Sequence, residues 1–182
     1  SITGKYLFFN QVDANIFKYF IPKDKIEVFN SKSENIKKSI KKIDQCRTIL
    51  INGTNHYEGN IFLIEDLLKV DRQKNINFEQ VFFKPHPRET EKNIELLKLF
   101  ANKRGLGNVI FISKKSTLFQ LPDYDSVLTA ISSSIHYYSD QGVLILLSPR
   151  ASKFDFTEKQ YTVYISALGA MKYKIINKNG IS

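Results

Sequence analysis

The chain has 182 residues, of which 42% are hydrophobic and 25% charged, and its formal net charge is +9 at pH 7. This composition suits a folded globular protein and excludes a disordered or fibrous class. The single cysteine, Cys46, excludes an internal disulfide and a metal site built from several cysteines. No apolar run reaches the roughly 18 residues of a membrane-spanning helix.

The first 46 residues carry two strand-like segments, at 6–9 and 26–29, with a helical pattern over 14–20 between them. They form either an extra βα unit of the main sheet or the remnant of an N-terminal acceptor domain, and both interpretations stay open. Because the sequence begins with serine and not with an initiator methionine, we expect a processed or truncated piece.

A basic run over 35–42 has Ile36, Ile40 and Ile43 at helical spacing with lysines between them. We interpret it first as a helix with a solvated basic face, and second as a nucleic-acid or membrane patch. The cationic excess of the whole chain favours an anionic partner, which is nucleic acid, a phosphorylated metabolite or an acidic membrane surface.

From residue 47 onward, short apolar runs alternate with helical patterns. The runs are nearly continuous and rich in β-branched and aromatic residues, as is typical of strands buried on both faces of a parallel sheet. They lie at 47–52, 80–84, 108–112, 126–130 and 142–147. Helices are predicted around 61–68, over 94–100 with an end near Gly105, and after the serines at 132–134. The segment 161–176 fits strand and helix equally.

This order predicts an α/β fold over 47–182, with a Rossmann-like parallel sheet flanked by helices. The strands would end at one edge, where ligands bind in open α/β sheets. Polar segments follow three of the strands directly, and their convergence indicates a ligand site more strongly than any one segment does. The candidate residues are Gly53, Thr54 and Glu58; Lys84, His86, Pro87 and Arg88; and Ser132, Ser133 and Ser134.

His86 lies between two prolines, which fix φ at about −65° and prevent the segment from continuing as helix or central strand. On such a stiff turn the imidazole could donate a proton or a hydrogen bond to a leaving phosphate, beside the positive charges of Lys84 and Arg88. The alternative is a rigid loop whose histidine caps the next helix.

The serine triplet offers hydroxyl and backbone N–H groups at a predicted helix start, where a phosphate is favoured, although serine is also a common N-cap. Glu58 is placed in a loop bounded by glycines, either as a general base toward a sugar hydroxyl or as an ordinary turn residue. His136 is interpreted as a packing residue. The sequence has no metal-ligand spacing, phosphate-binding P-loop or nucleophile elbow, so we expect metal-free chemistry.

The Lys-Pro-His-Pro-Arg segment at 84–88, followed by a strand that runs into Ser-Ser-Ser-Ile-His-Tyr-Tyr-Ser at 132–139, resembles the nucleotide-binding half of bacterial sialyltransferases. The lipooligosaccharide sialyltransferase type is the closest likeness, and polysialyltransferases are more distant. The resemblance implies the C-terminal half of a two-domain GT-B glycosyltransferase. It also implies inverting, metal-independent transfer of sialic acid from CMP-sialic acid to a terminal sugar, usually galactose.

The resemblance also implies roles for single residues. His86 would assist departure of the CMP phosphate, with Pro87 fixing its loop, and Lys84 would lie close to the cytidine. The serines would hold the phosphate. The acidic-acidic-Gly motif of the family falls on 57–59, so a tyrosine stands where the family has its catalytic base. The base is then Glu58, His56 or a residue outside this chain.

Two other functions stay open. The Lys-Pro-His-Pro segment also resembles enzymes that transfer glycerol phosphate from CDP-glycerol, and the basic run suits a non-enzymatic module that binds polyanions. In the preferred interpretation the partners are the nucleotide-sugar donor and a glycan or glycolipid acceptor of the bacterial surface, with no specific nucleic acid and no cofactor. The expected location is the bacterial cytoplasm, with peripheral contact to the inner membrane and homodimer formation left open.

Overall fold

The computed structural model describes residues 6–8, 22–28, 40–117, 120–132, 134–152, 173–177 and 180–181. They belong to two compact units, of which the first holds the described residues up to 28. There, β1 (Tyr6–Phe8) and β2 (Ile26–Val28) pair in parallel and form a separate two-stranded sheet. The 3-10 helix η1 (Lys23–Lys25) directly precedes β2. The helical pattern predicted over 14–20 lies outside the described residues.

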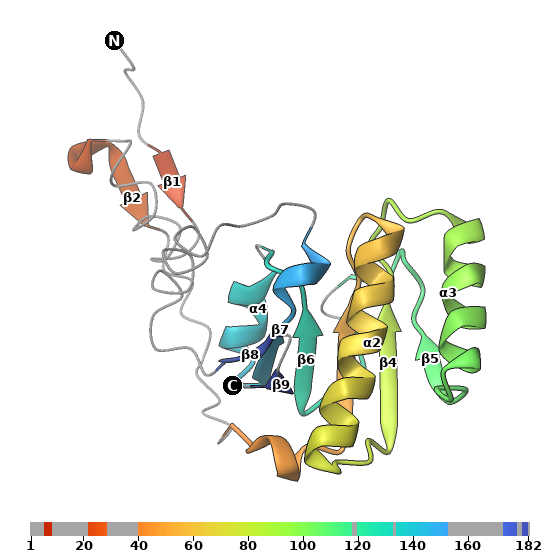
Figure 1. The fold of residues 1–182 in the computed structure, drawn as a ribbon. Helices are drawn as coiled ribbons and strands as arrows, with labels where there is room; N and C mark the ends of the chain where they lie inside the picture. Colours follow the sequence, from red (N-terminus) through yellow and green to blue (C-terminus); the bar gives the residue numbers. More distant parts are fainter. Residues whose placement is uncertain are drawn as a thin grey trace. The chain divides into compact units, whose positions relative to one another are not determined.

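The second unit is an α/β structure (Figure 1). Its strands are β3 (Thr48–Asn52), β4 (Gln80–Lys84), β5 (Val109–Phe111), β6 (Ser126–Thr129), β7 (Leu144–Leu147), β8 (Tyr173–Asn177) and β9 (Gly180–Ile181). Its helices are α2 (Tyr57–Lys74), α3 (Glu91–Lys103) and α4 (Ile135–Asp140), with 3-10 turns η2 (Ile43–Gln45) and η4 (Pro149–Ala151). The apolar runs predicted as strands are confirmed as β3 to β7, each boundary within two residues.

The seven strands follow the order β5-β4-β3-β6-β7-β8-β9, in which the first six are parallel and β9 is antiparallel to β8. If β3 is counted as the first strand, the six parallel strands have the 3-2-1-4-5-6 order of the Rossmann fold. The predicted parallel α/β sheet is therefore confirmed. The order reverses between β3 and β6, because the chain crosses from β5 at one edge back to the middle of the sheet.

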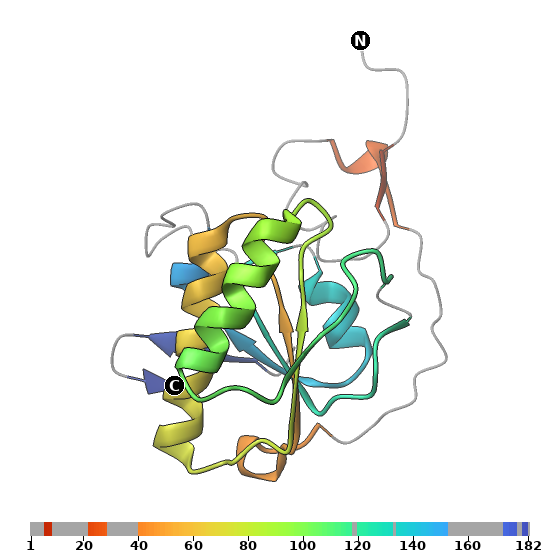
Figure 2. The same ribbon diagram turned by 90° about the vertical axis from the view of Figure 1, so that its right-hand side faces the viewer.

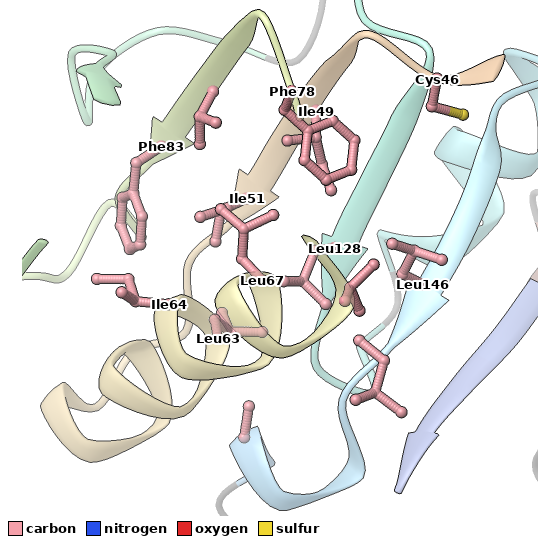
Figure 3. Packing of buried hydrophobic residues seen from close by; sticks show 14 of the residues in the cluster. Cys46, Ile49, Ile51, Leu63, Ile64, Leu67, Phe78, Phe83, Leu128 and Leu146 are labelled. Atoms are coloured by element: carbon pink, nitrogen blue, oxygen red, sulfur yellow. The ribbon is translucent and has the colours of Figure 1, made fainter. Parts of the chain in front are cut away.

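The two faces of the sheet are covered by different helices, as Figure 2 shows: α2 and α3 lie on one side and α4 on the other. Alternate residues of each strand face the α2 side, among them Ile49, Ile51, Phe83 and Leu128, and they pack against α2 (Figure 3). The residues of α2 buried in this core are Leu63, Ile64, Leu67 and Val70, each at most 1% exposed. Full burial of one such side chain contributes about 1.5 to 3 kcal/mol.

The predicted end of the second helix is confirmed. The N-cap of α3 is Thr90, whose Oγ1 accepts a hydrogen bond from the N–H of Asn93 at 3.1 Å. After the helix, Gly105 has φ 85°, a left-handed conformation that glycine adopts without the steric cost of a Cβ. This local signal could be read from the sequence because it depends only on neighbours along the chain.

The predicted helix over the basic run is wrong for residues 40–42, the part of the run that the structure describes. Residues 40–42 are not helical, and only a single 3-10 turn, η2, follows; residues 35–39 lie outside the described part. Lys41 pairs with Asp125 at 2.6 Å, while Ile43 and Cys46 are buried in the core. These contacts lead the chain directly into β3, so tertiary packing overrides the helical spacing. Of the ambiguous tail, Tyr173–Asn177 is strand β8 and 161–172 is not described.

No helix in the parts of the chain that the structure describes combines the length and the apolar character needed to cross a membrane.

Candidate functional site

The site begins at the point where the strand order reverses, between the carboxyl ends of β3 and β6. Open α/β sheets bind their ligands in the crevice at such a point. The last residues of β4, β3 and β6 are direct register partners across the sheet: Lys84, Asn52 and Thr129. Paired residues of neighbouring strands point to the same face, so these polar side chains form one row, which we call the strand-end row.

Asn52 is the centre of this row. Its Nδ2 donates to Thr129 Oγ1 at 3.2 Å and to Ser134 Oγ at 3.0 Å. Ser134 Oγ in turn lies 2.6 Å from Ser132 Oγ, and either hydroxyl can be the donor. The structure thus brings together two of the predicted serines with an asparagine and a threonine from the neighbouring strands. Ser133 lies outside the described residues.

The helix expected after the serines is present as α4 but is only six residues long. A helix this short aligns few peptide dipoles, so its N-terminus attracts an anion weakly. In addition, the N–H of Ile135 already donates to Ser132 O at 3.2 Å. The capacity of this cluster to bind an anion therefore comes from the serine hydroxyls and not from the helix start.

His86 is held on the turn that the prolines predict. β4 ends at Lys84, the N–H of Arg88 donates to His86 Nδ1 at 3.1 Å, and the N–H of Glu89 donates to His86 O at 2.9 Å. Because Nδ1 accepts, the proton of the neutral ring is on Nε2. Burial lowers the pKa of His86, and the charges of Arg88 and Lys84 lower it further while Glu89 opposes them. The resting imidazole is thus a neutral hydrogen-bond donor.

Lys84 supports this turn from inside. Its side chain is buried, and Nζ donates to the carbonyl oxygens of Pro85 and Lys114 at 3.1 Å each. Burial lowers the pKa of this amine. Lys84 therefore ties β4 to the segment after β5, whereas Pro87 and Arg88 are exposed at the surface of the turn.

Gly53 and Thr54 shape the loop after β3. The N–H of Gly53 donates to Lys84 O at 2.9 Å, and a Cβ at this position would lie 2.9 Å from the same oxygen. The N–H of Thr54 donates to Asn60 Oδ1 at 2.7 Å, and its Oγ1 donates to His56 O at 2.9 Å. These bonds join the loop to β4 and α2 and to itself, so they set its path beside the strand-end row.

The loop predicted around Glu58 is wrong, because 57–59 form the first turn of α2. His56 is the N-cap, and its Nδ1 accepts from the N–H of Gly59 at 3.1 Å. Tyr57 packs against the core, and Glu58 is exposed. A carboxylate in a first turn is favoured by the helix dipole, so Glu58 also stabilises the start of α2. The segment was misassigned because histidine is a less common N-cap than serine or aspartate.

Gly59 is required by close packing, and we expect Gly59→Ala to destabilise the protein by about 1 to 3 kcal/mol. The added Cβ would lie 2.3 Å from His56 Cε1 and 2.5 Å from the carbonyl oxygen of Ala151. Urea unfolding measures the change. At an open helical site the same substitution stabilises by up to about 1 kcal/mol, so a variant as stable as the wild type would contradict the packing. Gly107→Ala, in the turn before β5, is the control for the added methyl group, since its nearest atom is 3.5 Å away.

Four residues of the site are not among the single candidates named from the sequence: Asn52 and Thr129 in the strand-end row, and Asn60 and Glu89, which belong to the polar segments after β3 and β4. Asn60 is fully buried and Glu89 is 4% exposed. For Asn52 and Thr129 a signal existed, since each is a polar residue at the end of an otherwise apolar strand. Asn60 and Glu89 have no such mark, because the pattern around them suits an exposed polar residue equally well.

Among the residues that the structure describes, no group of three or more histidine, cysteine, aspartate or glutamate side chains is placed to hold a metal ion. Comparisons with protein-family models, with curated proteins and with solved structures each found no match. The Rossmann order of the sheet and the chemistry of its carboxyl edge are thus the basis for any assignment of function.

Proposed function

We propose that this chain is the nucleotide-binding half of an inverting, metal-independent sialyltransferase. In this proposal the carboxyl edge of the sheet binds CMP-sialic acid, and the sugar passes to a terminal galactose of a bacterial surface glycan. The geometry of the site supports a ligand that carries a phosphate, and the nucleotide-sugar class rests on the resemblance. The choice of sialic acid and the independence of metal rest on the resemblance of the segments at 84–88 and 132–139.

The observation that carries the proposal is the joint position of three features at the carboxyl edge of the sheet. The strand order reverses between β3 and β6, the Asn52–Ser134–Ser132 cluster lies beside this point, and the turn of His86 follows the adjacent strand. β4 and β6 flank β3, so they lie two strand spacings, about 10 Å, apart. A nucleotide phosphate between them is within reach of side chains from both.

The chemistry follows from these groups. The acceptor hydroxyl oxygen attacks the anomeric carbon, and the bond from this carbon to the phosphate oxygen breaks with its electron pair on the phosphate. His86 Nε2–H and the serine hydroxyls donate hydrogen bonds to the phosphate as its charge grows. The proton of the acceptor hydroxyl passes to a base. Glu58, exposed in the first turn of α2 on the same edge, is the carboxylate we propose for this step.

CMP is expected to bind the wild-type chain, and Ser134→Ala is expected to weaken binding at least about tenfold, because a hydrogen bond to a charged group contributes about 1.5 to 3 kcal/mol. Calorimetric titration and the ligand-induced rise in melting temperature measure this. Ser126→Ala is the matched control. It changes the serine at the amino end of β6, the strand that precedes Ser134, where Oγ donates to Thr48 O, so CMP affinity should not change.

A panel of CMP, CMP-sialic acid, CDP-glycerol and inorganic phosphate decides between the donors. Preference for CDP-glycerol over CMP-sialic acid would replace the sialyltransferase assignment with glycerol phosphate transfer. Absence of nucleotide binding, with steeply salt-dependent binding to polyanions, would reject both.

A further inference from the structure

Glu89 is a buried carboxylate directly after the turn of His86. Oε2 accepts from Asn60 Nδ2 at 2.8 Å, and Oε1 accepts from Asn93 Nδ2 at 2.8 Å and from the N–H of Thr90 at 3.2 Å. Its backbone N–H donates to His86 O at 2.9 Å. A side chain that is 4% exposed and accepts three hydrogen bonds has one defined position.

Asn60 connects this carboxylate to the other loop of the site. Its Nδ2 donates to both Glu89 Oε2 and Thr54 O, while its Oδ1 accepts from the N–H of Thr54 at 2.7 Å. Asn60 is fully buried, and its bonds use the donors and acceptors that an amide side chain has. The Glu89–Asn60 contact therefore ties the turn after β4 to the loop after β3.

The partners of the Glu89 carboxylate are neutral. In the part of the chain that the structure describes, its hydrogen-bond donors are two amide side chains and one backbone N–H. The nearby ammonium of Lys114 donates to Glu89 O, the backbone carbonyl, and pairs with Glu91. The negative charge of Glu89 is thus not cancelled by a bonded cation, and it acts on the charged groups around it.

We propose that Glu89 is a positioning residue for His86. It holds the turn in the geometry that leaves Nε2–H as the donor, and its charge favours the imidazolium that forms when a phosphate binds. This role deepens the proposed function and rests on it for its catalytic meaning. The charged groups that act on His86 are Lys84 from β4 and Arg88 and Glu89 from the turn. The two cations lower the pKa of His86, whereas Glu89 raises it.

The decisive experiment is an NMR titration of His86 in the full chain without any ligand. Glu89→Gln keeps an oxygen that accepts from Asn60, and Asn93 can rotate its amide to accept from the new NH₂ group, while the N–H of Thr90 loses its acceptor. Two of the three contacts are kept without the charge, so the turn should persist. We expect the His86 titration to move to lower pH in Glu89→Gln, because the loss of a negative charge disfavours the imidazolium. Glu89→Ala should also lose the uniform Nε2–H tautomer.

Glu91→Gln is the control for charge, since it removes a carboxylate two residues away whose side chain is 77% exposed. The His86 titration should stay unchanged in this variant. If Glu89→Gln leaves the His86 titration at the wild-type pH, or shifts it no more than Glu91→Gln does, the positioning role is wrong. If Glu89→Ala does not fold, the titration of Glu89→Gln tests whether the charge of Glu89 favours the imidazolium. The tautomer ratio of His86 in the wild type then tests whether the turn leaves Nε2–H as the donor.

A second measurement separates this inference from the proposed function. CMP-3-fluorosialic acid is an inert donor analogue whose phosphodiester does not titrate where histidine does. Its affinity should increase as pH falls through the His86 titration, and in Glu89→Gln this increase should move to lower pH. Glu89→Ala should bind about tenfold more weakly, or about 1.4 kcal/mol. If the wild type binds no analogue, the proposed function fails while the ligand-free titration still tests Glu89.

Discussion

Replacing His86 by asparagine is expected to lower the rate of sialic acid transfer by about 10² to 10⁴-fold, the range of a positioned proton or hydrogen-bond donor. The asparagine Oδ1 can still accept from the N–H of Arg88, as His86 Nδ1 does at 3.1 Å, so the turn should keep its conformation. What is lost is the Nε2–H donor toward the phosphate. Initial rates with CMP-sialic acid and a galactose-terminated acceptor measure the loss.

His86→Gln distinguishes the two ways in which the histidine can act. The glutamine NH₂ group can occupy the place of Nε2–H, but it cannot become a cation. The lowered pKa of His86 makes the neutral ring the main form in the ligand-free chain at pH 7, and the imidazolium that a bound phosphate favours also donates from Nε2–H. We therefore expect the hydrogen bond to dominate and His86→Gln to be about tenfold faster than His86→Asn. Equal rates for the two variants would instead show that His86 acts by transferring a proton. Full activity of both variants would show that His86 has no role in the reaction.

Replacing Arg150 by methionine is expected to destabilise the second unit by about 3 kcal/mol, the lower end of the range for breaking a buried ion pair. Arg150 donates to Asp66 Oδ1 from Nε at 3.0 Å and from Nη2 at 2.6 Å. The side chain of Asp66 is only 2% exposed, so the variant leaves a buried carboxylate whose remaining partner is Ser148 Oγ at 2.6 Å. The melting temperature should fall by about 6 to 12 °C.

Arg104→Met is the matched control for this prediction. Arg104 is 51% exposed and Arg150 44%, and each guanidinium lies over a phenylalanine ring. The carboxylate beside Arg104 belongs to Glu65, which is 32% exposed, so water can solvate it and the cost should stay below about 1 kcal/mol. If both variants lose the same stability, burial of Asp66 is not the cause.

A double variant tests the same mechanism from the other side. Asp66→Asn combined with Arg150→Met removes the charge together with its partner, while the amide oxygen can still accept from Ser148. It should be more stable than Arg150→Met alone by about 1 to 2 kcal/mol, because the buried unpaired charge is gone. A double variant that is less stable than the single one would contradict this account.

The amino-acid sequence by itself determined the elements of the α/β unit and the edge on which the candidate residues lie. Nearly continuous apolar runs mark β3 to β7, the two prolines mark the turn of His86, and Gly105 marks the end of α3. These signals are local, since each depends on backbone preferences and on burial of neighbouring residues along the chain. The same local signals indicate that the polar segments after three of the strands lie at one edge of the sheet.

The tertiary structure alone decided which of these segments meet. Asn52 and Ser134 are 82 residues apart, Asn60 and Glu89 29 apart, and Asp66 and Ser148 82 apart. Such pairs depend on strand order, because only the crossing from β5 to β6 places the serines beside β3. The same packing places Glu58 in the first turn of α2, where a loop was expected, and keeps residues 40–42 non-helical before η2 and β3. Contacts between distant segments leave no periodic mark in the sequence, so their partners appear only once the sheet is assembled.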